Sequence, residues 1–155
     1  MKPLYLLLLS LALLLFAGCG KMPENGDLDG LWQLVEMHSK ADPTDPQYSH
    51  YTDKRTEKVR WAFQLQLLSM KSFDLLPGTD TNEAVARFQY SGDRLQLTQI
   101  YLHYRDRDQL VEDPATVQFQ TLGVRGCKAQ FRIAKLGGSR LILCSDMDSL
   151  VFVKK

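Results

Sequence analysis

Hydrophobic and polar residues alternate along most of this chain with a period of two. Hydrophobic side chains occupy every second position in one stretch: Val59, Trp61, Phe63, Leu65 and Leu67. Polar residues fill most of the intervening positions. This spacing predicts β-strands that bury one face and leave the other in water.

Shorter stretches repeat the alternation, and turn residues separate them. Together they predict about nine strands joined by short turns. The other strands are expected around residues 31–37, 73–75, 86–90, 95–104, 117–120, 131–136, 140–144 and 150–153. The turns are expected at Pro77-Gly78, Ser91-Gly92-Asp93, Gly137-Gly138 and Asp146-Met147-Asp148.

One predicted strand changes parity along its length. Leu95 and Leu97 are hydrophobic at odd positions, and Ile100 and Leu102 continue at even positions. A β-bulge near Thr98–Gln99 would keep all four side chains on the same face. Bulges of this kind also let a sheet curl into a barrel.

These strands define the expected fold class. No stretch has the spacing of an amphipathic helix, and many short consecutive strands favour an antiparallel barrel or sandwich. We expect an all-β, up-and-down antiparallel meander over residues 28–155 that closes into a barrel of about 8–9 strands. Closure would remove the exposed edges of the sheet.

The segment Ser39–Thr56 interrupts the alternation. It is long, polar and broken by two prolines, and it contains Tyr48, His50 and Tyr51. A loop of this length within a compact domain is either functional or disordered. The sequence leaves both alternatives open.

The N-terminus has the pattern of an export signal. Lys2 precedes an apolar run from Leu4 to Phe16, which is shorter than the roughly 20 residues that span a bilayer. The following residues, Phe16-Ala17-Gly18-Cys19, resemble the lipobox of bacterial lipoproteins, although Phe16 stands where that family usually has Leu. An ordinary secretory signal with a coincidental cysteine is the alternative.

The lipobox resemblance implies how the chain is processed. Residues 1–18 would be removed as a signal peptide, and acyl chains such as palmitate would attach to Cys19. Residues 19–27 would tether the domain to a membrane of the cell envelope, and we expect the outer membrane, on its periplasmic or surface face.

The charge balance bears on possible partners. The chain has 19 basic and 18 acidic residues, without a basic block. Such a balance gives no electrostatic reason to expect nucleic acid as a partner.

The start of the first predicted strand, with Gly30 and Trp32, resembles the Gly-x-Trp motif of lipocalins. The layout of residues 28–153 is similar to the small lipocalin-like domains of lipoproteins from Gram-negative bacteria. The resemblance implies a barrel whose interior holds one small apolar ligand. It also implies a basic residue from a late strand packed on Trp32, for which Arg140 is preferred over Lys154.

Inward-facing aromatic residues are the candidate ligand contacts. They are Trp61, Phe63, Phe73, Phe88 and Tyr90. They would either line a pocket or fill the barrel as core, and the core interpretation is favoured. Tyr48 and Tyr51, from the long loop, would then cover one end of the barrel.

Cys127 and Cys144 are the cysteines that would remain in the mature domain besides Cys19. An oxidising envelope favours a disulfide between them. A two-residue Gly137-Gly138 turn places Phe131 opposite Cys144, which separates the two cysteines by about 13 Å. Because a disulfide spans at most about 7 Å between Cα atoms, the chain would have to bend back to form one.

Other chemistry finds no support in the sequence. The three histidines, His38, His50 and His103, lack metal-ligand spacing, and His103 is expected on the wet face of the sheet. The sequence has no nucleophile motif of the Gly-x-Ser-x-Gly kind. We therefore expect no metal, no cofactor and no enzymatic activity.

Two functions remain as hypotheses. The leading one is a membrane-anchored lipocalin-like lipoprotein that binds a small apolar ligand in the cell envelope. The alternative is a non-enzymatic envelope interaction or assembly module with a filled core. Cavity volume discriminates between them, because ligand pockets reach roughly 300 Å³ or more.

Overall fold

The computed structural model describes residues 23–113, 115 and 119–155, so the predicted signal peptide and Cys19 lie outside the described residues. Its elements there are ten strands and two short 3-10 helices. The strands are β1 (Gly30–Ser39), β2 (His50–Asp53), β3 (Arg60–Gln64), β4 (Leu67–Lys71), β5 (Glu83–Ser91), β6 (Arg94–His103), β7 (Asp108–Leu110), β8 (Ala129–Gly137), β9 (Arg140–Cys144) and β10 (Asp148–Lys154). The 3-10 helices are η1 (Gly26–Leu28) and η2 (Phe119–Leu122).

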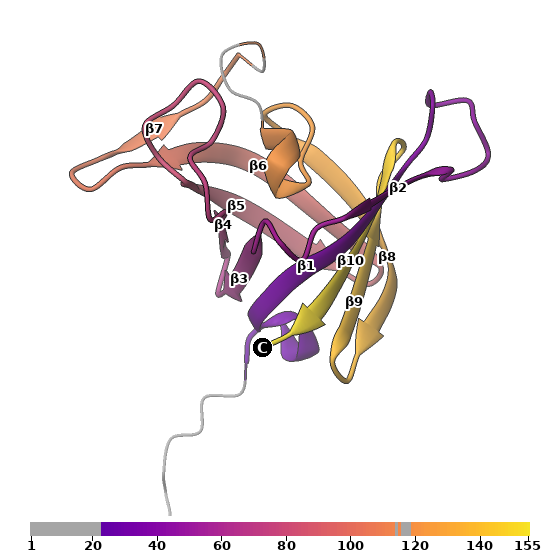
Figure 1. The fold of residues 1–155 in the computed structure, drawn as a ribbon. Helices are drawn as coiled ribbons and strands as arrows, with labels where there is room; N and C mark the ends of the chain where they lie inside the picture. Colours follow the sequence, from indigo (N-terminus) through magenta and orange to yellow (C-terminus); the bar gives the residue numbers. More distant parts are fainter. Residues whose placement is uncertain (1–22, 114, 116–118) are drawn as a thin grey trace, which may run out of the picture.

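Eight of the strands form a closed antiparallel ring, in the order β1, β3, β4, β5, β6, β8, β9 and β10. The ring closes because β10 pairs with β1 as well as with β9. The two remaining strands lie outside the ring. Strand β2 pairs with the part of β1 that does not pair with β3. Strand β7 pairs with the part of β6 that does not pair with β8. The prediction of an all-β antiparallel meander that closes into a barrel is confirmed (Figure 1).

The alternating pattern of the sequence becomes the inside and outside of this barrel. In β6, the buried residues are Leu95, Leu97, Ile100 and Leu102. The expected bulge lies where the parity changes, because Arg87 pairs with Gln99 and Phe88 with Leu97. Thr98 is therefore the extra residue, and the bulge keeps all four apolar side chains in the core.

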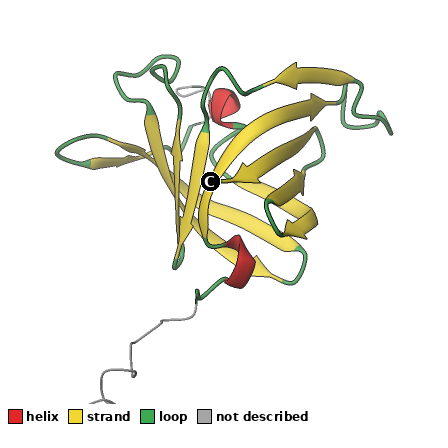
Figure 2. Ribbon diagram, turned by 60° about the horizontal axis from the view of Figure 1, so that its bottom comes forward, coloured by secondary structure: helices red, strands yellow, loops and turns green. Residues whose placement is uncertain are grey.

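Each end of the barrel is covered by one 3-10 helix, and a buried tryptophan is bonded to each. At the end where the chain enters, Trp32 Nε1 donates a hydrogen bond to the carbonyl oxygen of Leu28 in η1 at 2.8 Å. At the opposite end, Trp61 Nε1 donates to the carbonyl oxygen of Leu122 in η2 at 2.9 Å. All four residues are fully buried. Figures 1 and 2 show η1 and η2 at opposite ends of the ring.

The basic residue on Trp32 is Lys154, not Arg140 as expected from the resemblance. Lys154 Nζ lies 5.0 Å from the centroid of the Trp32 ring and donates a hydrogen bond to the carbonyl oxygen of Asp27 at 3.0 Å. Arg140 is exposed at the start of β9. The expectation was wrong because β10, rather than β9, is the late strand that pairs with β1.

Several local predictions were also wrong. The strand predicted from Val59 to Leu67 ends at Gln64 and turns at Leu65-Gln66 into β4, so Leu65 and Leu67 are exposed instead of inward-facing. No strand forms at the predicted residues 73–75.

Phe119 begins a 3-10 helix instead of continuing a strand, and it is buried at the barrel end. Phe73 lies in the connection after β4 with 68% of its surface exposed, so it is not an inward aromatic residue. The segment Ser39–Thr56 is not wholly a loop, since it contains β2.

Candidate functional site

The barrel interior is filled by aromatic side chains. Trp61, Phe63 and Phe88 are at most 4% exposed. The ring centroids of Trp61 and Phe152 lie 4.9 Å apart, and those of Phe63 and Phe88 lie 5.3 Å apart in an edge-to-face arrangement. Such distances are the packed contacts of a protein core. The structure thus places these three candidate residues in the core rather than around a cavity.

The other candidate residues, Phe73, Tyr90, Tyr51 and Tyr48, lie in four different places. Tyr90 is partly buried and packs against the core, where it pairs with Leu95. Tyr51 is 56% exposed on β2, and its ring lies 5.2 Å from the ring of His38. The candidate set predicted from sequence is therefore not assembled into one pocket.

Tyr48 reaches an open groove on the outer wall of the barrel. We call it the arginine groove, and it has a volume of about 390 Å³. Its lining residues come from the long loop, the β5–β6 turn, the start of β6, β8, the end of β9 and the β9–β10 turn: Tyr48, Asp93, Arg94, Gln130, Phe131, Arg132, Cys144, Ser145 and Asp146. The Tyr48 hydroxyl donates a hydrogen bond to the carbonyl oxygen of Ser145 at 2.9 Å, which ties the long loop to the wall.

Two arginines lie directly opposite each other in this groove. Arg94 on β6 pairs with Arg132 on β8, and both side chains are on the exposed outer face. Like charges directly opposite on neighbouring strands destabilise a sheet. Within the part of the chain that the structure describes, neither guanidinium forms an ion pair or a hydrogen bond, and Asp93 and Asp146 lie beyond ion-pair distance. The arrangement suits an anion held between the two arginines.

Partial burial affects the tyrosine that covers the groove. Burial raises the pKa of the Tyr48 hydroxyl above its ordinary value, and Cys144 and Asp146 act in the same direction. The positive charge of Arg132 opposes the rise. Tyr48 is thus neutral at physiological pH and offers an aromatic ring and a hydroxyl beside the arginines.

A second hollow opens where β6 and β8 separate. These strands pair only over Arg94–Leu97 and Ala129–Arg132, and beyond that point β6 pairs with β7. The hollow between them has a volume of about 550 Å³ and is lined by Thr98, Gln99, Leu110, Val111, Glu112, Cys127 and Lys128. It combines apolar and charged side chains without a group that would select one ligand class.

The two cysteines of the domain are free thiols, so the structure does not contain the disulfide considered from the sequence. Cys144 lines the arginine groove and Cys127 lines the second hollow. The bulge between Ile133 and Lys135 shifts the register, so Arg132 rather than Phe131 lies opposite Cys144. Burial raises the pKa of the Cys127 thiol, and Asp113 adds to the rise.

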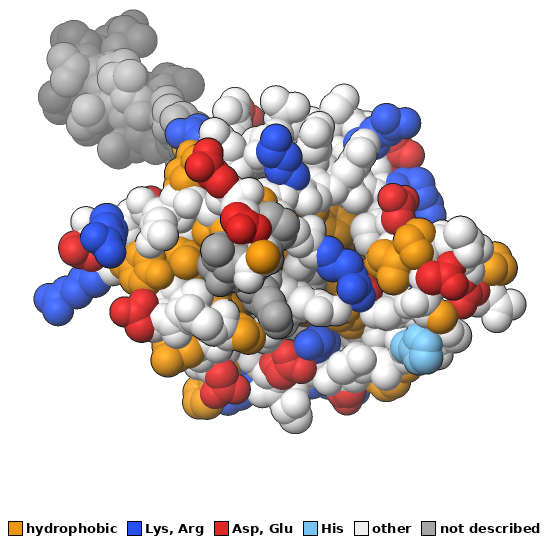
Figure 3. Space-filling view, turned by 90° about the horizontal axis from the view of Figure 1, so that it is seen from above, with side chains coloured by type: hydrophobic (Ala, Val, Ile, Leu, Met, Phe, Trp, Pro, Cys, Tyr) orange, Lys and Arg blue, Asp and Glu red, His pale blue; other side chains and the backbone are white. Residues whose placement is uncertain are grey.

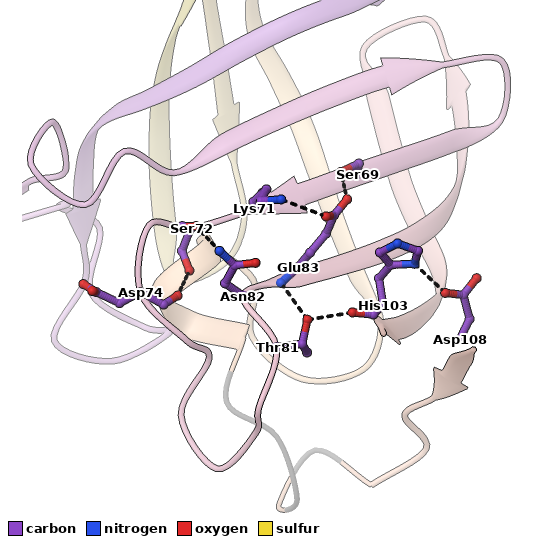
Figure 4. A network of polar contacts seen from close by, with 9 residues as sticks. All are labelled: Ser69, Lys71, Ser72, Asp74, Thr81, Asn82, Glu83, His103 and Asp108. Atoms are coloured by element: carbon purple, nitrogen blue, oxygen red, sulfur yellow. Dashed lines mark hydrogen bonds and ion pairs between the residues drawn. The ribbon is translucent and has the colours of Figure 1, made fainter. Parts of the chain in front are cut away.

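A polar network covers the outer face of β4, β5 and β6 (Figure 4). In it, Glu83 accepts hydrogen bonds from Ser69 and Lys71 at 2.8 and 3.3 Å, and His103 contacts Asp108 at 2.7 Å. The exposed position of His103 agrees with the wet face expected for it. These are strand-to-strand contacts. Among the described residues, no group of His, Cys, Asp and Glu is arranged to hold a metal ion.

The closed meander, the Gly-x-Trp start of β1 and the lysine on Trp32 define a lipocalin-like domain. A family model described as "Lipocalin-like domain" matches residues 13–155, and the chain belongs to this family. A comparison with curated proteins found no match.

Two solved structures from Bacteroides share the fold. One is a lipocalin-like protein from Bacteroides uniformis ATCC 8492, with 20% identity and a TM-score of 0.54, over 84% of this chain and 100% of that chain. The other is an uncharacterized protein from Bacteroides eggerthii DSM 20697, with 13% identity and a TM-score of 0.53, over 82% of this chain and 98% of that chain. At these identities the likeness concerns the fold alone.

Sequence reasoning missed both arginines of the groove. Arg94 follows the predicted Ser91-Gly92-Asp93 turn, and Arg132 has the outward parity beside Phe131. The sequence therefore allows each arginine to be predicted as an exposed residue of a strand. Their proximity depends on the pairing of β6 with β8, which are separated by a long connection.

Proposed function

We propose that this chain is a lipid-anchored, non-catalytic lipocalin-like protein that binds a small amphipathic anion in the arginine groove. The observation that carries the proposal is the pair Arg94 and Arg132, which lie opposite each other without an anionic partner among the described residues. The filled interior argues against the apolar ligand inside the barrel that the resemblance implies. The groove volume of about 390 Å³ falls in the range of small-molecule sites.

The groove favours a carboxylate or phosphate group joined to a short apolar part. Guanidinium groups bind both kinds of oxyanion with paired hydrogen bonds. The Tyr48 ring provides an apolar surface beside them. Asp93 and Asp146, which also line the groove, would disfavour a ligand with several negative charges.

Anchoring through Cys19 is the other part of the proposal. The lipobox-like residues 16–19 support it, and two or three acyl chains make a stable anchor. No helix in residues 23–113 or 119–155 has the length and apolar character to cross a membrane. Labelling of the expressed full chain with radioactive palmitate tests the anchor, and Cys19→Ala should abolish the label.

Calorimetric titration with hexanoate and hexyl phosphate tests the groove, with hexanol as the uncharged comparison. Replacing either Arg94 or Arg132 with Gln should weaken binding of at least one anion about tenfold, the typical effect of losing a charged hydrogen bond. Arg87→Gln is the matched control, because Arg87 is exposed on neighbouring β5 but does not line the groove. Equal binding of hexanol, or equal loss in the control, would contradict the proposal.

The filled core also favours a second candidate, an interaction module that works through its outer wall. One row of outward positions crosses six strands and is mostly apolar: Leu31, Ala62, Ser69, Val85, Tyr101 and Leu110. Crosslinking from this row to an envelope protein, combined with no anion binding in the groove, would favour this function.

A further inference from the structure

The tip of the β3–β4 hairpin carries an unusual residue. Gln64 pairs with Leu67, so Leu65 and Gln66 form the two-residue turn. Leu65 has a φ of 55°, in the left-handed region that turns normally reserve for Gly, Asn or Asp. A bulky residue held in this conformation is strained and marks a candidate functional position.

This tip also exposes apolar surface. Leu65 is 55% exposed and Leu67 is 46% exposed. Leu31, near the start of the adjoining strand β1, is 37% exposed. The sequence therefore places a leucine at the turn position where a polar residue would be both unstrained and better solvated.

The tip lies beside the point where the chain leaves the barrel toward Cys19. Asn25 Nδ2 donates hydrogen bonds to the carbonyl oxygen of Leu65 at 2.7 Å and to Asp29 at 2.7 Å. Cys19 is six residues before Asn25. Even a fully extended segment of that length reaches only about 21 Å, so an acylated Cys19 keeps this end of the barrel close to the bilayer.

Among the described residues, the charged side chains at the tethered end of the barrel do not form a basic patch that would draw it to anionic lipid. Lys154 is engaged with Trp32 and the carbonyl oxygen of Asp27, and two acidic residues, Asp27 and Asp29, lie at the same end. The exposed apolar residues Phe73 and Leu75 lie beyond the other end of β4, in the connection from β4 to β5. Figure 3, which looks onto that opposite end, shows basic, acidic and hydrophobic side chains interspersed over it.

We propose that the leucine tip, Leu65 and Leu67, is a membrane-contact surface that seats the tethered end of the barrel on the lipid bilayer. Shallow insertion of apolar side chains into the interface removes them from water, and it adds to acyl anchoring. The seat fixes the orientation of the domain, with the η2 end directed away from the membrane. This inference rests on the proposed anchoring at Cys19 and is independent of ligand binding.

The test uses the acylated protein in vesicles of phosphatidylcholine, with and without dibrominated phosphatidylcholine as a quencher of tryptophan fluorescence. Leu65→Trp places a reporter at the tip, and Leu67→Trp is a second reporter in case the first variant folds poorly. Leu75→Trp is the matched control, because Leu75 is 60% exposed near the opposite end. Trp32 and Trp61 are fully buried and contribute the same background in every variant.

Brominated lipid should reduce the added fluorescence of a tip reporter at least about twofold and leave the added fluorescence of the Leu75→Trp variant nearly unchanged. Replacing part of the phosphatidylcholine with phosphatidylglycerol should not change this result. Equal quenching at both ends, or no quenching at the tip of the acylated protein, would contradict the membrane-contact surface. Neither result would contradict the acylation of Cys19. Absence of acyl chains on Cys19, measured by mass spectrometry, would overturn both.

Discussion

At the scale of single residues, Trp32 and Trp61 pair with each other on β1 and β3, and each is bonded to the 3-10 helix at a different end of the barrel. Each indole N–H is bonded to a backbone carbonyl of a 3-10 segment, at 2.8 Å for Trp32 and 2.9 Å for Trp61. A buried carbonyl that loses its donor retains its desolvation cost. The bonds therefore hold η1 and η2 in place in addition to the packing of the rings.

Trp61→Phe tests this role directly. The smaller aromatic ring keeps most of the apolar contacts but removes the donor to Leu122, so the free energy of unfolding should fall by about 2 kcal/mol. Trp61→Ala should cost more, about 3–5 kcal/mol, because it also leaves a cavity. Urea unfolding measures both changes. An unchanged midpoint in Trp61→Phe would show that the bond to Leu122 does not stabilise the fold.

Cys127 gives a pH-dependent prediction. Because burial raises the pKa of its thiol above the ordinary value of 9.0, the unfolded chain releases this proton first as pH rises. The resulting stability is complete below the ordinary pKa and is lost as pH rises through the folded-state value. Alkylation of Cys127 by iodoacetamide, followed by peptide mass spectrometry, should show a higher pH midpoint in folded than in urea-unfolded protein. Identical midpoints would contradict the assignment.

At the scale of elements, the segment after η2 depends on one glycine. Gly123 has a φ of 88°, and a Cβ built there would lie 3.0 Å from Leu150 Cδ1 and 3.6 Å from Leu34 Cδ2. Arg125 then joins this segment to the buried carboxylate of Asp148 through Nε at 2.5 Å. The chain can pass so close to the core only where it lacks a side chain.

Gly123→Ala should therefore destabilise the protein by about 2 kcal/mol, from the left-handed backbone and the contact with Leu150 together. Gly92→Ala is the control, because Gly92 has a φ of 60° but a Cβ added there would meet nothing within 4 Å. It should incur only the backbone cost, about 1 kcal/mol. Thermal unfolding of both variants measures the difference, and equal losses would mean that the Leu150 contact is unimportant.

The sequence predicted those elements whose two faces differ in polarity. The strands β3, β5 and β6 alternate cleanly, and the parity change located the bulge at Thr98. Short exposed strands carry no such signal, which is why β2 was assigned to a loop. Phe119 was misassigned because a single turn of 3-10 helix that covers a barrel end has no periodicity to detect.

At the scale of the whole molecule, the pairings between neighbouring strands of the ring differ in length. The β1–β10 pairing extends from Trp32 to Ser39, whereas β6 and β8 pair only over Arg94–Leu97. The arginine groove lies on this short seam, and the repulsion between Arg94 and Arg132 weakens it further. The long connection between β6 and β8 also explains why the groove was not predictable, because local patterns do not fix a pairing between distant strands.

Hydrogen exchange should reveal this difference. Backbone amides of β6 and β8 at the seam should exchange about tenfold faster than those of β1 and β10, because local opening requires fewer bonds to break. Exchange measured by mass spectrometry resolves these peptides. Hexanoate or hexyl phosphate, if bound in the groove, should slow exchange at the seam more than elsewhere. Uniform protection around the ring would contradict an uneven barrel.

The described part of the chain begins and ends at the same pole of the barrel, which affects how the protein can be engineered. Lys155 N–H donates to the carbonyl oxygen of Leu31 at 2.9 Å, and Figure 1 shows the C-terminus beside η1. A fluorescent protein or affinity tag fused after Lys155 would emerge next to the proposed acyl anchor, where space is smallest. Cargo intended to project outward should instead be inserted in the exposed turn around Thr44, within the β1–β2 connection.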